Sequence, residues 1–341
     1  MTAAYLTKKQ INFWLPALLL WMSAGCAIDP DIPEPSYSVP IPEGFPAIPY
    51  PDDNFPDVGR IALGKELFFD PVLSVDSTVS CNNCHLTQWA FADHAPISAG
   101  VEGRLGFRNA PTLANVAWQP IMTMDGGSPT LEQQFYIPLE DFHEMAFNMV
   151  LLTDRLQADP YYTDRFYQVF EDLPSPFTIT RAIAAYERTI ISGNSKYDQV
   201  MRGIANFTPS EQIGYDLFFS DSLACSSCHS PPFFTNFEFL NNGLYETYYP
   251  DSGRARITVD PDDAGKFKVP TLRNIAWTWP YMHDGSLPDL ATVIDHYQNG
   301  GSGHRNQDPR VHPLHLNDEQ KQDLILFLNT LTDDDFLQQS D

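Results

Sequence analysis

The chain has 341 residues, of which 43% are hydrophobic and 13% aromatic, and its formal net charge is −24. This length allows two ordinary domains, each with its own hydrophobic core. The acidic balance excludes nucleic acid as a partner, because such binding needs clustered basic side chains. It also argues against adsorption to anionic lipid and favours a basic or neutral partner protein.

The first 25 residues have the pattern of an export signal. Two lysines form a basic region, an apolar run follows over residues 11–22, and small residues precede Cys26. The run is shorter than the roughly 20 apolar residues of a membrane span. The ending SAGC resembles a bacterial lipoprotein signal, although Ser23 replaces the usual leucine. We therefore expect a periplasmic or cell-envelope protein, lipidated at Cys26, with plain secretion as the alternative.

Residues 26–56 form a proline-rich segment. Nine prolines fall between Ala27 and Pro56. This density excludes a helix and predicts an extended, semi-rigid spacer. Behind a lipid anchor, such a spacer would hold the body of the protein away from the membrane.

Four of the five cysteines lie in two motifs of the same pattern, CNNCH and CSSCH. C-x-x-C-H is the attachment signal for c-type haem. Cysteines three residues apart share one helical face, so both thiols reach one porphyrin and the histidine reaches its iron. A redox dithiol or half of a zinc site is the alternative, which the repetition disfavours. The sequence thus predicts two haem c groups, held by Cys81, Cys84, Cys225 and Cys228, with His85 and His229 as iron ligands.

The body of the chain repeats itself. The segment over 63–74, which precedes the first motif, resembles 213–224, which precedes the second. Downstream, PTLANVAW over 111–118 matches PTLRNIAW over 270–277. Two copies of one haem-binding unit are the simplest explanation.

Helical patterns dominate both copies, and alternating strand patterns are few. We predict an all-α, mostly helical fold of two cytochrome c-like domains, 57–205 and 206–341, related by internal duplication. Some chain from each half is expected to fold onto the other. Helices are expected over 58–70, 130–136, 146–157, 178–193, 209–219, 290–298 and 317–332, the last with Asn317 as its N-cap.

From Val58 to Leu331 the chain resembles the bacterial dihaem cytochrome c peroxidase and MauG family. Besides the two haem motifs, the resemblance is carried by FADHAPISAGVEGRLGFRNAPTLANVAW, DGGSPTLEQQFYIPLEDFHEM and FKVPTLRNIAWTWPYMHDG. It implies that peroxide reacts at the N-terminal haem and that electrons pass through the C-terminal haem. It also implies a calcium ion between the domains.

The resemblance implies an open first haem. Typical peroxidases of the family have a capping histidine where this chain has Val101, and valine cannot bind iron. His94 is the alternative sixth ligand. The resemblance also places Glu144 and Gln134 at this haem, where a carboxylate shuttles the peroxide proton and an amide positions peroxide. A surface acid is the alternative for Glu144, and neighbouring Gln133 is the alternative for Gln134.

At the second haem, typical peroxidases of the family use a methionine fourteen residues after the histidine of YxHDG. The same count from His283 reaches Tyr297, and MauG-type proteins have tyrosine there. A phenolate is hard and anionic, so it favours ferric and higher iron states. Met282 is the competing ligand, and a packed aromatic residue without iron contact is the further alternative for Tyr297.

Two further sites follow from the resemblance. The family's tryptophan between the haems is replaced by Met124, which puts fast charge sharing in doubt, and Trp118, Trp277 and Trp279 are candidates to replace it. The predicted calcium ligands are Asn109 and, through backbone carbonyls, Thr278 and Pro280; an oxygen-only set suits a hard cation.

The leading functional prediction is a peroxidase that receives electrons from a small donor protein of the cytochrome c or cupredoxin type. The first alternative is MauG-like oxidation of side chains in a partner protein. A dihaem electron carrier and a haem-based sensor are the alternatives outside this enzyme class, and an open iron argues against the carrier. A homodimer is possible on family grounds.

Overall fold

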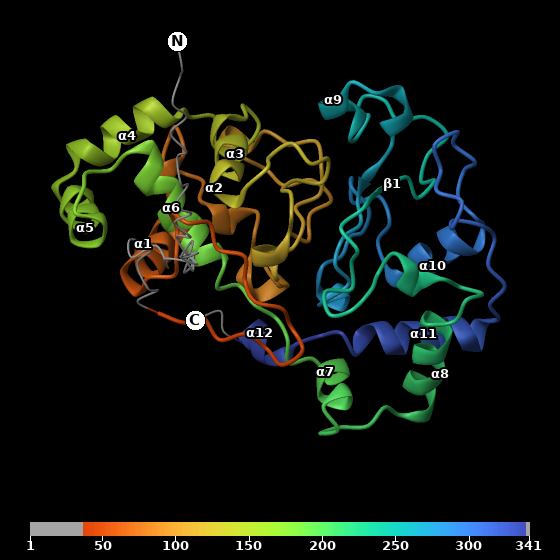
Figure 1. Ribbon diagram of the computed structural model, residues 1–341. Helices are drawn as coiled ribbons and strands as arrows, with labels where there is room; N and C mark the ends of the chain where they lie inside the picture. The colour runs from red at the N-terminus through yellow and green to blue at the C-terminus, as the bar shows by residue number, and fades with distance from the viewer. Residues whose placement is uncertain (1–36, 339–341) are drawn as a thin grey trace, which may run out of the picture. The chain divides into compact units, whose positions relative to one another are not determined.

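The computed structural model describes residues 37–338, which are mainly helical (Figure 1), so the predicted export segment and Cys26 lie outside the described residues. The all-α prediction is confirmed. Within the described range, no helix is long and apolar enough to cross a membrane. The helices and strands are α1 (Val58–Phe69), α2 (Leu131–Gln134), α3 (Tyr136–Glu140), α4 (Met149–Ala158), α5 (Pro160–Phe170), α6 (Pro176–Glu187), α7 (Lys196–Met201), α8 (Pro209–Phe218), β1 (Phe239–Leu240), α9 (Ala255–Thr258), β2 (Phe267–Lys268), α10 (Leu290–Gln298), α11 (Asp318–Asn329) and α12 (Asp334–Gln338).

Local capping explains where the main helices begin. Asn317 caps α11, as predicted, by accepting a hydrogen bond of 2.8 Å from the backbone N–H of the third helical residue. The helix expected over 178–193 ends earlier, at Glu187. α5 was not expected from the sequence; Asp159 caps it, and Pro160 occupies the first helical position, where proline is tolerated.

Each half is built on two helices that cross in close contact. α1 crosses α6 at Gly64, where a Cβ atom would lie 1.8 Å from the Ala182 carbonyl oxygen. α8 crosses α11 at Gly214, where a Cβ atom would lie 2.0 Å from the Asp323 carbonyl oxygen. A side chain at either position would force the helices apart. The two glycines hold matching places in the repeated segments before the two motifs, which supports the predicted duplication.

The two helix pairs belong to separate hydrophobic cores, and β1 and β2 form a small antiparallel pair in the second half. The first core includes the buried side chains of Leu63, Leu67, Leu139, Leu152, Phe166 and Ile179. The second core includes those of Phe218, Phe234, Ile294, Phe327 and Leu331.

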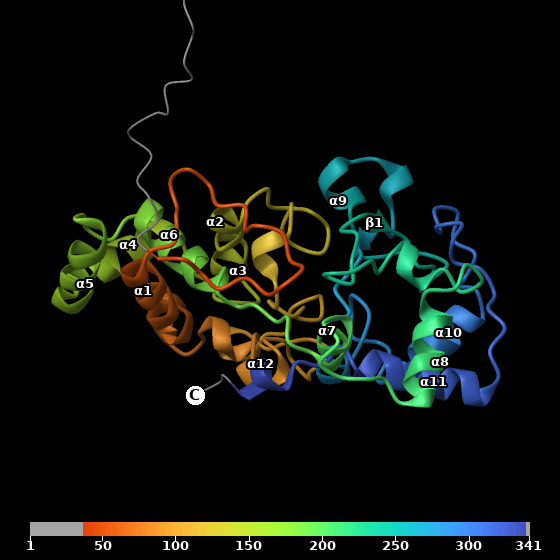
Figure 2. The same ribbon diagram turned by 60° about the horizontal axis from the view of Figure 1, so that its bottom comes forward.

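Each half receives a helix from the other half of the sequence. Tyr197 of α7 precedes the expected boundary but packs against Phe234 and Phe327 of the second core. Phe336 of α12, near the end of the chain, packs against Phe91 beside the first core, and Figure 2 shows α12 beside the first half. This exchange agrees with the expectation that chain from each half folds onto the other.

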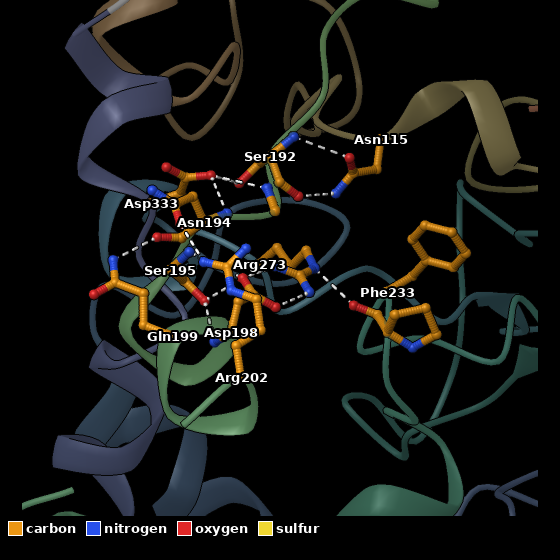
Figure 3. Close-up of polar contacts among 12 residues, drawn as sticks. Asn115, Ser192, Asn194, Ser195, Asp198, Gln199, Arg202, Phe233, Arg273 and Asp333 are labelled. Atoms are coloured by element: carbon orange, nitrogen blue, oxygen red, sulfur yellow. Dashed lines mark hydrogen bonds and ion pairs between the residues drawn. The ribbon is translucent and has the colours of Figure 1, made fainter. Parts of the chain in front are cut away.

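A buried polar seam anchors the exchanged segments (Figure 3). Asn115 and the backbone of Ser192 exchange two hydrogen bonds, of 2.9 and 3.0 Å. The Asp333 carboxylate accepts hydrogen bonds from the Ser192 hydroxyl and from the backbone N–H groups of Gly193 and Asn194. Removing one partner of such a buried bond costs roughly 1–3 kcal/mol. These bonds therefore fix the segment before α7 and the segment before α12 relative to each other.

The described part of the proline-rich segment lies against the body of the protein. Val39 and Ile48 are each only 6% exposed. The indole N–H of Trp118 donates a 3.0 Å hydrogen bond to a backbone carbonyl of the segment. Residues 37–56 of the predicted spacer contain no helix, as expected, but they pack against the body of the protein because hydrophobic side chains between the prolines are buried there.

Candidate functional site

The first cysteine motif forms a tight turn that fixes its histidine. Cys81–Asn83 form a single 3-10 turn, and the backbone N–H of His85 donates to the Cys81 carbonyl at 2.9 Å. The Cys81 and Cys84 thiols are not in a disulfide. The Nδ1 atom of His85 lies 3.1 Å from the Phe91 carbonyl oxygen. Because a carbonyl only accepts, Nδ1 carries the proton and Nε2 keeps a free lone pair.

The second motif repeats this geometry. The backbone N–H of His229 donates to the Cys225 carbonyl at 2.9 Å. Its Nδ1 atom lies 3.1 Å from the Phe234 carbonyl oxygen and 3.2 Å from that of Pro270. The Cys225 and Cys228 thiols are also free. The ring is again held through Nδ1, which leaves Nε2 available to a metal.

The electrostatics of both motifs fit haem attachment. Burial, helped by the charge of Glu144, raises the pKa of Cys84 to about 11, and burial raises the pKa of Cys225 to about 12. Burial lowers the pKa of His85, and lowers that of His229 to about 4. The thiols are therefore protonated and the imidazoles neutral at physiological pH. Neutral imidazoles with a free nitrogen beside paired thiols are what iron ligation and covalent attachment require.

Glu144 lies at the first motif. Its negative charge contributes to the raised pKa values of Cys81 and Cys84, so its carboxyl group is electrostatically coupled to both thiols. Burial, with repulsion from Asp141, raises the pKa of Glu144 itself to about 7. Val101 is fully buried and donates its backbone N–H to the Glu144 carbonyl at 2.8 Å. The first motif thus has a titratable carboxylate, beside an apolar residue that offers no ligand atom.

Gln134 and Gln133 differ in their surroundings. Gln134 ends α2 and is partly buried. Gln133 is exposed and lines a surface pocket of about 490 Å³. This difference favours Gln134 over its neighbour for an internal site. Within residues 37–338 no hydrogen bond joins Gln134 to Glu144, so their joint action stays a prediction.

His94 is held in an aromatic stack between the two halves. Its ring centroid lies 3.7 Å from that of Trp89 and 3.7 Å from that of Trp279, with interplanar angles of 28° and 29°. Its Nε2 atom lies 3.0 Å from the Trp277 carbonyl oxygen. Binding iron would require His94 to break all three contacts, so the structure does not support the alternative ligand. Trp89 was missed from the sequence, although it lies only four residues after His85.

The stack also suggests which residues could take the role of the family's tryptophan, which Met124 replaces in this chain. Met124 does lie where the halves meet, because its carbonyl accepts a 2.7 Å hydrogen bond from the backbone N–H of Lys268 in β2. Trp118 of the first half packs against the proline-rich segment and against Phe233 of the second half, with ring centroids 5.1 Å apart. Trp89 of the first half and Trp277 of the second are stacked, with centroids 5.7 Å apart and an interplanar angle of 23°. All three candidates therefore make aromatic contacts across the halves, Trp277 and Trp279 through the stack with Trp89 and His94, and Trp118 through Phe233.

Tyr297 lies at the second motif. Burial raises the pKa of its phenol to about 12, against a lowering hydrogen bond from Asn242, and the charges of Cys225 and Cys228 also act on it. The phenol is therefore electrostatically coupled to both thiols. The Met282 sulfur lies 3.1 Å from the Asn242 side-chain nitrogen. The Met282 sulfur thus meets the amide of a residue that no sequence motif marked.

The predicted calcium ligands lie in segments that join the halves. The Asn109 side-chain N–H group donates to the Ala95 carbonyl at 3.1 Å, and its backbone N–H donates to the His283 carbonyl at 2.8 Å. Thr278 is partly buried, and Pro280 is buried. Over residues 37–338 no cluster of three or more His, Cys, Asp or Glu side chains suits a metal. A calcium site made of amide and carbonyl oxygens stays a prediction.

Known proteins with this arrangement define the class of the chain. Residues 59–206 match the family model described as di-haem cytochrome c peroxidase. A cytochrome c peroxidase of Pseudomonas sp. (strain SCT) is 31% identical over 320 residues, covering 84% of each chain. The methylamine utilization protein MauG of Methylorubrum extorquens is 32% identical over 295 residues, covering 84% of this chain and 81% of its own length. The chain belongs to the dihaem cytochrome c peroxidase and MauG family.

Solved structures share the fold. A MauG-like protein associated with microbial copper homeostasis has a TM-score of 0.84 and 34% identity, covering 89% of this chain and 97% of that one. The diheme peroxidase BthA of Burkholderia thailandensis has a TM-score of 0.72 and 25% identity, covering 83% of this chain and 88% of its own. The prediction of a peroxidase-type oxidoreductase is confirmed at the level of the family.

Proposed function

We propose that this protein reduces hydrogen peroxide at the His85 site, with electrons that enter through the His229 site. The observation that carries the proposal is the partly buried carboxyl group of Glu144 at the first motif, beside the fully buried Val101. A haem iron with a single protein ligand supplies an open coordination position and the electrons for cleaving the O–O bond. The residues that would hold the two haems are Cys81, Cys84 and His85 for the first, and Cys225, Cys228, His229 and Tyr297 for the second.

Glu144 performs the proton transfer that this reduction needs. One peroxide takes up two electrons and two protons and becomes two waters, so a proton must move from its inner oxygen to its outer oxygen. The Glu144 carboxylate takes that proton and returns it to the departing oxygen. Its pKa of about 7 makes both steps accessible near neutral pH. Gln134 orients the peroxide through its amide.

The aromatic stack is the route between the two sites. Trp89 follows the first motif, and its stacking on Trp277 gives a direct contact between the halves. The stacked His94 ring joins Trp89 to Trp279 as well. An electron leaving Trp89 is replaced from Trp277, so the stack is unchanged after each transfer. This route would replace the one that Met124 interrupts.

Oxidation of a partner protein is the second candidate function. Tyr297 at the second motif favours it, since an anionic ligand stabilises oxidised iron. The related structure of 34% identity is also described as MauG-like. Trp277 and Trp279 are 38% and 41% exposed, so the stack reaches a surface where a partner side chain could be oxidised.

The net charge, Cys26 and the predicted calcium ligands support proposals for the donor, the location and the link between the halves. The net charge of −24 favours a basic or neutral donor of the cytochrome c or cupredoxin type. Lipid attachment at Cys26 would keep the protein in the cell envelope. Calcium held by Asn109, Thr278 and Pro280 would tie the two halves together.

Peroxide consumption by the purified holoenzyme tests the proposal. With a reduced small cytochrome c or cupredoxin as donor, we expect steady turnover and oxidation of two donor molecules per peroxide. Consumption only in the presence of a partner protein that loses tryptophan or tyrosine would favour the second candidate. Two intact haems without consumption under either condition would contradict both and favour an electron carrier.

A further inference from the structure

A second pocket lies on the first half of the protein, away from the one that Gln133 lines. It measures about 800 Å³ and is formed by the proline-rich segment, α1, the chain between α6 and α7, and α12. Sites for small molecules usually measure about 300–1,000 Å³. Among the described residues, none of the CNNCH motif lines this pocket, and neither does Val101 or Glu144. The pocket is therefore separate from the place where peroxide would react.

The inner wall of the pocket adjoins the first motif. Phe91, Tyr186 and Phe336 line it, and they are 8%, 7% and 4% exposed. All three belong to one hydrophobic cluster, against which Cys81 packs. The Phe91 carbonyl oxygen is the one that lies 3.1 Å from Nδ1 of His85. A molecule in the pocket would thus be separated from the predicted iron ligand by one residue, Phe91.

The outer rim of the pocket is apolar and exposed. The side chains of Tyr37, Ile41 and Val58 line it, although they are 39%, 42% and 59% exposed. Exposed apolar groups that gather around a hollow mark sites where another molecule binds. The rim and the aromatic inner wall together favour a flat, apolar ligand.

Two polar groups of the lining have unused hydrogen-bonding capacity. The Nε atom of Arg202 is buried and has no hydrogen-bond partner within residues 37–338, although another nitrogen of its guanidinium donates to the Asn194 side chain. The Tyr186 hydroxyl likewise has no hydrogen-bond partner in this part of the chain. Buried polar groups are ordinarily hydrogen-bonded. A ligand that carries oxygen atoms on an aromatic ring would meet both needs.

A dihydroxyarene, such as a hydroquinone or a catechol, has this chemistry and the right electron count. When its two O–H bonds break, it loses two electrons and two protons and becomes a quinone. One hydrogen peroxide takes up two electrons and two protons and becomes two waters, so one molecule of each reacts. Asp335 is an exposed carboxylate in the lining, and it can pass the released protons to solvent.

We propose that this pocket binds a dihydroxyarene, which reduces the first site directly from the side of His85. The inference rests on the proposed function, because it needs peroxide to be reduced at the His85 site. It adds an entry for electrons that does not use the His229 site. Tyr37 at the rim is eleven residues from Cys26, a length that spans at most about 40 Å. Lipid attachment at Cys26 would therefore keep the pocket within reach of hydroquinones in the membrane.

The test supplies duroquinol as the only reductant to the holoenzyme, with hydrogen peroxide and without oxygen. Absorbance of duroquinone follows the reaction. We expect saturable oxidation, with one duroquinol consumed per peroxide. The variant Cys225→Ser with Cys228→Ser should keep this activity, because the electrons enter at the first site.

Ala62→Trp blocks the pocket. Ala62 is an exposed residue of α1 that lines the pocket, so an indole there occupies the space of the ligand without disturbing the core. We expect kcat/KM for duroquinol to fall by about tenfold or more, as loss of substrate binding gives, while turnover with a reduced cytochrome c stays unchanged. Ala158→Trp is the matched control, because Ala158 is an exposed alanine on α4, outside the pocket. If Ala62→Trp does not accumulate with both haems, Tyr186→Phe should raise KM for duroquinol.

Binding is measured separately from activity. Isothermal titration of the resting ferric protein with duroquinone should give saturable binding in the unaltered protein and in Ala158→Trp, but none in Ala62→Trp. Comparison of a decyl-substituted quinol with catechol then identifies the source. A lower KM for the decyl quinol supports a donor from the membrane, and a lower KM for catechol supports a soluble donor.

Turnover with a cytochrome c but neither oxidation of duroquinol nor binding of duroquinone would overturn the inference and leave the proposed function standing. Equal rates with duroquinol in Ala62→Trp and Ala158→Trp would also overturn it, because the pocket would not be the site of binding. Peroxide consumption with neither donor would instead contradict the proposed function itself.

Discussion

The two halves share one scaffold but differ at the residues that face their motifs. In both, a glycine lets two helices cross, and a histidine is held through Nδ1 by backbone carbonyls. The first motif has a carboxylate, Glu144, next to buried Val101. The second has a phenol, Tyr297, and an amide, Asn242. The scaffold sets where a haem can attach, and a few side chains set what each site can do.

The halves also differ in how they are stabilised. Arg273 is fully buried and pairs with Asp198 through two 2.8 Å bonds, as Figure 3 shows. The matching residue of the first repeat is Ala114, and the first half has instead the buried pair of Arg188 and Glu132. The repeated sequence has therefore diverged in its ion pairs as well as in its sites.

Removing the first pair of cysteines should have the largest effect. We expect Cys81→Ser with Cys84→Ser to lose one of the two covalent haems and all peroxide turnover, because the reacting site is lost. A pyridine haemochrome assay counts the haems that remain. The matching variant, Cys225→Ser with Cys228→Ser, should keep the first haem and its reaction with peroxide but lose turnover with a donor protein. Equal peroxide reactivity in the two variants would contradict the division of roles.

Glu144→Gln should lower turnover by roughly 10²- to 10⁴-fold, the usual contribution of a general acid–base group. Both haems should stay attached, since the substitution is nearly isosteric. Glu140→Gln is the control, because Glu140 is an exposed acid in the same region. Stopped-flow rates of the reaction with peroxide give the comparison. An unchanged rate in Glu144→Gln would exclude the carboxylate from the chemistry.

Glu144 should also make the rate of the reaction with peroxide increase with pH. Burial first, and then repulsion from Asp141, raise the pKa of Glu144 to about 7. The carboxylate form takes the peroxide proton, so the rate should rise with pH through about 7 and then level off. Glu144→Gln should flatten this part of the profile. A profile that keeps the same step in the variant would assign the titration to another group.

Asp198→Asn should destabilise the protein by about 3–5 kcal/mol, because it leaves the buried Arg273 guanidinium without its counter-charge. Burial alone would raise the pKa of Asp198, but the Arg273 charge and its hydrogen bonds hold that pKa below its ordinary range. This stability is thus present above the ordinary carboxyl pKa and is lost as pH falls. Denaturant unfolding measures it. The control Asp262→Asn breaks an exposed pair with Arg305 and should cost under about 1 kcal/mol.

Trp89→Leu should have the smallest effect, a slowing of electron transfer between the haems by about tenfold, as a barrier increase of roughly 1.4 kcal/mol gives. Stopped-flow reduction of the first haem through the second measures this rate. Phe177→Leu is the control, because Phe177 is a half-exposed aromatic residue on α6 of the first half, outside the stack. A similar slowing in both variants would mean that the stack is not the route.

The sequence predicted most of the fold because the signals were local or repeated. The two cysteine motifs, the Asn317 cap and the paired glycine segments are each readable over a few residues. The packing of residues 37–56 was not, because burial of Val39 and Ile48 depends on partners from distant segments. The α7 and α12 exchange could be expected only in outline, since it depends on tertiary contacts.

For the sites, the haem motifs were predictable and their surroundings were not. Spacing identifies the cysteines, and resemblance points to Glu144 and Tyr297. The stacking of Trp89 on residues almost 200 positions away, and the contact of Asn242 with Met282, have no local pattern. Such contacts arise only when loops from separate repeats or helices are brought together.

The central claim is that the iron of the first haem has an open coordination position and the iron of the second haem does not. The most direct measurement is the electron paramagnetic resonance spectrum of the resting ferric protein, recorded before and after peroxide is added without reductant. We expect a high-spin signal from the His85 site beside a low-spin signal from the His229 site, with the high-spin signal lost on peroxide addition. Two low-spin signals that ignore peroxide until the protein is half-reduced would contradict the claim.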